Sequence, residues 1–71
     1  MNKQPCIKIQ NYILVLSKIE FVGEIVNLHH PKMIYFTIGM GTQVLQISYE
    51  NRQECEFDRQ KVLTEIGYTD G

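Results

Sequence analysis

The 71-residue chain has no tryptophan, only two cysteines and two prolines, and almost no net charge. The cysteines, Cys6 and Cys55, stand too far apart for the close ligand pairs of a structural zinc site. With seven Lys plus Arg residues against eight Asp plus Glu, the field of the whole molecule attracts neither nucleic acid nor an anionic membrane. We therefore expect reduced cysteines, no metal or other cofactor, and no nucleic-acid partner.

Long apolar runs are also missing. None approaches the roughly 20 residues that cross a bilayer, and the first residues lack the basic-then-apolar layout of a secretory signal. We expect a soluble, cytoplasmic protein without a membrane segment. Ile, Val, Leu and Phe nevertheless make up 22 of 71 residues, which is above the roughly 20% level of disordered chains. The sequence should fold as one domain spanning residues 1–71.

Residues 7 to 49 have the composition of strands, because Val, Ile, Tyr, Phe and Thr recur there in short runs broken by Asn, Gly, His and Pro. Strands are predicted at about 6–10, 12–16, 18–28, 33–38 and 42–49, and a helix at about 52–66. Ser17 and Gly23 interrupt the period-two pattern and should mark bends. The predicted class is α+β: a small antiparallel meander of four to five strands with one C-terminal helix packed on one face.

The clearest unit is a β-hairpin formed by the last two predicted strands. An even-numbered loop, such as a two-residue turn with Gly39 at the position of positive φ, keeps apolar residues of both strands on one side. That side collects Ile34, Phe36, Ile38, Leu45, Ile47 and Tyr49. A three-residue loop would mix the two faces, so we predict the even-numbered register.

Asn51 and Glu54 have the spacing of a capping box, which predicts the start of the helix. One apolar stripe follows at helical spacing, and Gly67 is a natural stop. The stripe consists of Cys55, Val62, Leu63 and Ile66. Phe57 lies off the stripe, so it either packs at the start of the helix or belongs to an interface.

No catalytic set stands out. Cys55 falls on the apolar stripe, where a thiol is buried rather than nucleophilic, and no serine has the G-x-S-x-G motif of a serine nucleophile. The glycines near residue 40 lead into a strand, whereas a phosphate-binding loop normally leads into a helix. His29 and His30 are adjacent in a loop that contains proline, where a solvated turn is the simplest interpretation. We expect that the protein is not an enzyme. A minimal hydrolase that uses His29 or His30 is the alternative from that class.

The remaining signal is an excess of apolar side chains over what one short helix can cover. These candidate interface residues are Tyr12, Leu14, Leu16, Met33, Tyr35, Val44 and Phe57. They predict a non-catalytic binding module that forms a homo-oligomer, a dimer or larger, and acts as a regulator or inhibitor by occupying the surface of a protein partner. The alternative for the same residues is that the sheet curls and buries them within one chain. A core in so short a chain rarely contributes more than about 3–5 kcal/mol, which favours self-association.

A second function from a different class uses the cationic and aromatic residues. An oligomer could sequester an anionic small ligand, such as a signalling nucleotide, in a pocket at a subunit interface. Its candidate ligand-binding residues are Lys18, His29, His30, Lys32 and Tyr35.

Overall fold

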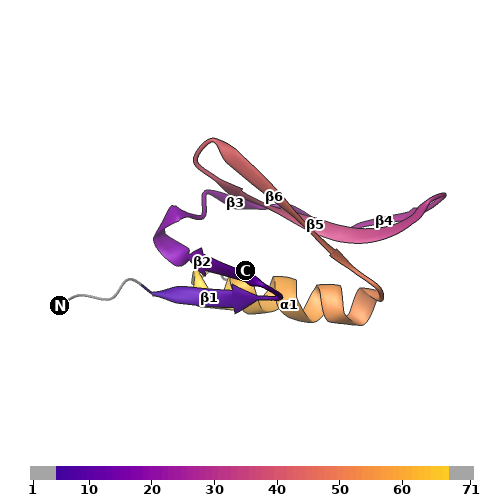
Figure 1. Ribbon diagram of the computed structural model, residues 1–71. Coiled ribbons are helices and arrows are strands. Elements are labelled where there is room, and N and C mark those ends of the chain that lie inside the picture. Colours follow the sequence, from indigo (N-terminus) through magenta and orange to yellow (C-terminus); the bar gives the residue numbers. More distant parts are fainter. Residues whose placement is uncertain (1–4, 68–71) are drawn as a thin grey trace.

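The computed structural model describes residues 5–67, which form six strands and one α-helix (Figure 1). The strands are β1 (Cys6–Ile9), β2 (Tyr12–Val15), β3 (Phe21–Val22), β4 (Val26–His29), β5 (Lys32–Met40) and β6 (Gln43–Tyr49), and the helix is α1 (Arg52–Glu65). All strand pairs are antiparallel. The predicted α+β class with a C-terminal helix is confirmed, and the predicted four to five strands are close to the six observed.

The strands form two sheets that face each other as two layers. Strands β1 and β2 make a separate hairpin, whereas β5 is the central strand of the larger sheet. On one side of β5 lie β3 and β4, end to end, and on the other side lies β6. Figure 1 shows the larger sheet as one layer, with the β1–β2 hairpin and α1 together in the other. We call the side of the larger sheet toward the hairpin and helix its inner face, and the opposite side its outer face.

The predicted register of the β5–β6 hairpin is confirmed. Ile34 is paired with Tyr49, Phe36 with Ile47 and Ile38 with Leu45, so all six predicted side chains share the inner face. The predicted turn residue is wrong, because Gly41 and Thr42 form the two-residue turn and Gly41 has the positive φ of 59°. Gly39 lies within β5 instead, opposite Phe21.

The single strand predicted at 18–28 is also wrong. Residues 16–18 form a 3₁₀ turn, and β3 and β4 are separated by residues 23–25. Both predicted bends, Ser17 and Gly23, fall in these interruptions. The second one is fixed from two sides, because the Gly23 N–H donates to the Thr37 carbonyl at 2.7 Å and the Gly23 carbonyl accepts from Nε of Arg59 at 2.8 Å. The chain can leave the ladder there because the helix satisfies the freed carbonyl.

The core lies between the inner face and the second layer. Its buried residues are Ile7, Ile9, Leu14, Ile34, Phe36, Ile38, Ile47, Cys55 and Val62. The helix contributes Cys55 and Val62, as its stripe predicts, with Leu63 half-buried. Ile66 departs from the prediction, because the helix ends at Glu65 and Ile66 is its 39% exposed C-cap.

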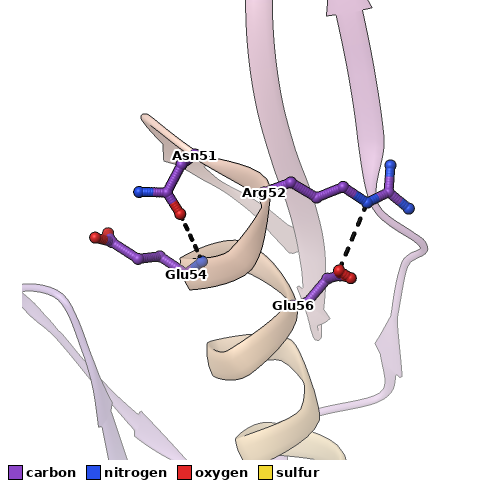
Figure 2. Close-up of polar contacts among 4 residues, drawn as sticks. All are labelled: Asn51, Arg52, Glu54 and Glu56. Atoms are coloured by element: carbon purple, nitrogen blue, oxygen red, sulfur yellow. Dashed lines mark hydrogen bonds and ion pairs between the residues drawn. The ribbon is translucent and has the colours of Figure 1, made fainter.

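Polar contacts define the start of the helix and, with the Arg59–Gly23 hydrogen bond, hold it to the sheet. The Asn51 side chain accepts a hydrogen bond from the Glu54 N–H at 2.8 Å, which confirms the predicted N-cap (Figure 2). Figure 2 also shows the exposed ion pair between Arg52 and Glu56 one turn apart. Toward the sheet, the Tyr49 hydroxyl donates to Oδ2 of Asp58 at 2.7 Å. The start of α1 is therefore held to the end of β6.

Candidate protein-binding face

The outer face of the larger sheet is the main apolar surface that no other element covers within residues 5–67. The strand register assigns to it Phe21, Val26 and Leu28 from β3 and β4, Met33, Tyr35, Thr37 and Gly39 from β5, and Val44, Gln46 and Ser48 from β6. None of these side chains carries a charge. Val44 is 60% exposed, Phe21 49% and Leu28 41%. Exposed apolar side chains that gather on one uncovered, uncharged face are typical of interaction sites.

Phe21 and Gly39 form a specific contact on this face. The two residues are directly paired between β3 and β5, and a β-carbon at Gly39 would overlap the ring of Phe21. The ring therefore lies against the bare backbone of Gly39, which is itself buried. Glycine at this position lets an aromatic side chain lie against the sheet instead of standing away from it.

The structure divides the predicted interface residues among different surroundings. Met33, Tyr35 and Val44 lie on the outer face. Leu14 is only 2% exposed, because it pairs with Ile7 in the β1–β2 hairpin and both pack into the core. The prediction that Leu14 faces a partner is thus corrected: this chain buries it.

Three other predicted interface residues lie away from the outer face. Leu16 is half-buried and packs against the core from the 3₁₀ turn, and Tyr12 is 39% exposed on the hairpin. Phe57 is 72% exposed on α1, so it is not a core residue of this chain. Since α1 packs on the inner side of the sheet, Phe57 cannot belong to the same surface as Val44 (Figure 1).

One chain does not bring the predicted anion-binding residues together. Lys18 lines an open hollow of about 500 Å³ beside the Gly41 turn, and the acidic residue Glu20 lines it too. His29 and Lys32 flank the other turn, at the opposite end of the nine-residue strand β5. Eight residue steps along a strand separate the two ends of β5 by about 26 Å. A site that contains both lysines would need a second copy of the chain.

Cys55 and Tyr49 both have raised pKa values, which favour the neutral forms of their side chains. Burial raises the pKa of the Cys55 thiol, and the side chain is 0% exposed, so the nucleophilic thiolate is disfavoured. Burial and the hydrogen bond to Asp58 raise the pKa of Tyr49, which keeps its phenol neutral. Within residues 5–67 no three His, Cys, Asp or Glu side chains gather to hold a metal ion. The same residues include no helix long and apolar enough to span a bilayer.

Sequence reasoning missed half of the apolar outer face. The predicted strand at 18–28 includes Val26 and Leu28 but gives them no neighbours, whereas the structure pairs them with Tyr35 and Met33. The sequence does carry a signal for this pairing: a two-residue turn at residues 30–31 sets the register of β4 and β5, as the turn at 41–42 does for β5 and β6.

Searches against known protein families, curated proteins and solved structures find no match for the chain.

Proposed function

We propose that the protein is a small, non-catalytic binding module that occupies the surface of a partner protein through its outer face. The observation that supports the proposal is the combination of exposed apolar side chains and missing charge on that face. Leaving Val44, Phe21 and Leu28 in water is unfavourable, and burial against another protein removes that cost.

The chemistry of the face limits the kind of partner. A nucleic acid or an anionic ligand needs cations, and the outer face presents none among its ten assigned positions. An apolar, uncharged surface on the partner fits, because neither side then leaves an unpaired charge buried. By covering such a surface, the module would block other contacts of the partner, which is how a regulator or inhibitor without catalysis acts.

Site-specific photocrosslinking in the source cells tests the proposal. A photoreactive amino acid replaces Val44 or Leu28 on the outer face. In the matched control it replaces Ile13, which is 71% exposed on the β1–β2 hairpin. We expect the same discrete protein adduct from Val44 and Leu28 and none from Ile13. The adduct identifies the partner by mass spectrometry.

Binding of the identified partner is then measured with purified variants. Val44→Lys should weaken the affinity at least about tenfold, because it buries an unpaired charge, whereas Ile13→Lys should leave it unchanged. Equal crosslinking from all three positions, or full affinity of Val44→Lys, would refute the proposed surface.

A further inference from the structure

The free edge of β6 is a second unpaired feature, distinct from the outer face. Strand β6 pairs with β5 on one side, and within residues 5–67 no strand lies along its other side. The seven residues of β6 include no charge and no proline. Proteins usually protect the edge of a sheet with charged residues, proline, a bulge or a covering segment, because its unpaired N–H and C=O groups attract another strand. The opposite edge is protected by the break at residues 23–25 between β3 and β4.

The hairpin register shows which backbone groups face this edge. Met40 and Gln43 close the two-residue turn, so they form a hydrogen-bonded pair, and the pairs alternate from there along the hairpin. Val44, Gln46 and Ser48 therefore direct their N–H and C=O groups away from β5. One of these groups already has a partner, because the Ser48 carbonyl accepts a hydrogen bond from Nε2 of Gln10 at 2.8 Å. That contact independently confirms the outward direction.

We propose that β6 pairs with β6 of a second copy of this chain, in antiparallel orientation about a two-fold axis at Leu45. Antiparallel pairing of one strand with itself satisfies two-fold symmetry without any new complementary surface. In this register Val44 pairs with Gln46 of the partner subunit, and Gln46 pairs with the partner's Val44. The two pairs make four backbone hydrogen bonds, and the two Leu45 side chains meet on the inner side.

The Gln10 contact favours this register over its nearest competitor. A two-fold axis at Gln46 would pair Ser48 with Val44 of the partner subunit and would need the Ser48 carbonyl that Gln10 already holds. An axis at Leu45 uses only Val44 and Gln46, whose outward groups make no hydrogen bond within residues 5–67. The dimer also joins two outer faces into one longer surface. Its formation does not depend on the proposed function, because it uses backbone groups of the edge.

A pair of substitutions at Gln46 tests the dimer. Gln46→Pro removes the outward N–H, which takes no part in pairing with β5, and proline is tolerated at such positions of edge strands. Gln46→Ala is the matched control, because it also removes the side chain but keeps the N–H. Mass is measured by sedimentation velocity over a concentration series from about 1 μM to about 1 mM, since so small an interface gives a weak dimer. We expect twice 8.3 kDa at the upper end for wild type and Gln46→Ala, and 8.3 kDa throughout for Gln46→Pro.

Residue-resolved amide exchange gives a readout that does not depend on proline. Raising the concentration should slow exchange at the amides of Val44 and Gln46 at least about tenfold and leave Ser48 unchanged. If Gln46→Pro fails to fold, Val44→Pro against Val44→Ala repeats the comparison. A wild-type chain that stays at 8.3 kDa, a proline variant that folds and still dimerises, or protection that includes Ser48 would overturn the proposal. Loss of the crosslinked partner with an intact dimer would refute only the proposed function.

Discussion

Replacing Gly39 by alanine tests the contact that shapes the outer face. The new β-carbon would overlap the ring of Phe21, so the ring must swing away from the sheet. The strand itself gains from the substitution, because alanine in a strand is about 0.5–1 kcal/mol more favourable than glycine. The measured effect is therefore the difference between the lost ring contact and the improved backbone.

The size of the lost contact follows from the exposure of Phe21. The side chain is 49% exposed, so it buries about half of its surface. Full burial of a phenylalanine contributes up to about 3 kcal/mol, and loss of half of it costs about 1.5 kcal/mol. Gly39→Ala should therefore destabilise the wild-type fold by about 0.5–1 kcal/mol. In a Phe21→Ala background the overlap is gone, and the same substitution should stabilise the fold by about 0.5–1 kcal/mol.

A double-mutant cycle measures this change of sign. Wild type, the two single variants and the double variant are unfolded with urea, at a protein concentration low enough to keep the chain monomeric. The expected coupling energy between Phe21 and Gly39 is about 1.5 kcal/mol. If Gly39→Ala changes the free energy of unfolding equally in both backgrounds, within about 0.5 kcal/mol, the ring does not lie against Gly39 and the reasoning is wrong.

Three further predictions concern the helix and the buried groups. Asn51→Ala should lower the free energy of unfolding by about 1 kcal/mol in urea titrations, because it removes the N-cap hydrogen bond, and an unchanged midpoint would contradict the assigned cap. A thiol reagent should modify the exposed Cys6 in the native protein and reach Cys55 only on unfolding; equal native rates would show that Cys55 is not enclosed. Burial and Asp58 raise the pKa of Tyr49, so the folded state favours the neutral phenol. The contribution of this phenol to the free energy of unfolding is present below its ordinary pKa of 10.0 and is lost as the pH rises above it. Tyr49→Phe should therefore lose less stability than wild type between pH 10 and 11, and parallel curves would contradict the assignment.

Much of the β5–β6 hairpin and the helix could be predicted because local patterns specify them. The alternation of apolar side chains in β5 and β6 has a single register that puts Phe36 and Ile47 on one face, and only an even-numbered turn allows it. The helix start at Asn51 is equally local, since the capping side chain and the Glu54 N–H that donates to it lie within four residues. The exact turn was mispredicted because Gly39 and Gly41 are both adjacent to Met40, and only the contact with Phe21 tells them apart.

The candidate site was predicted less completely, because it depends on which layer covers which face. Both faces of the hairpin strands carry apolar residues, so the sequence alone could not tell that Leu14 packs inward while Val44 stays exposed. Val26 and Leu28 belong to the same face as Tyr35 and Met33 because β4 pairs with β5 across the turn at residues 30–31, and this pairing is not evident from either strand alone.

Periodicities and caps that act over a few residues are enough to predict the α+β class, the hairpin register and the start of the helix. Long-range packing determines that the β1–β2 hairpin and α1 share one side of the larger sheet, and that the outer face and the edge of β6 remain open within residues 5–67. The physical reason is that a short chain has too few elements to cover both sides of its sheet. Which side is covered depends on long-range contacts such as Arg59 with Gly23 and Gln10 with Ser48, which no local pattern encodes.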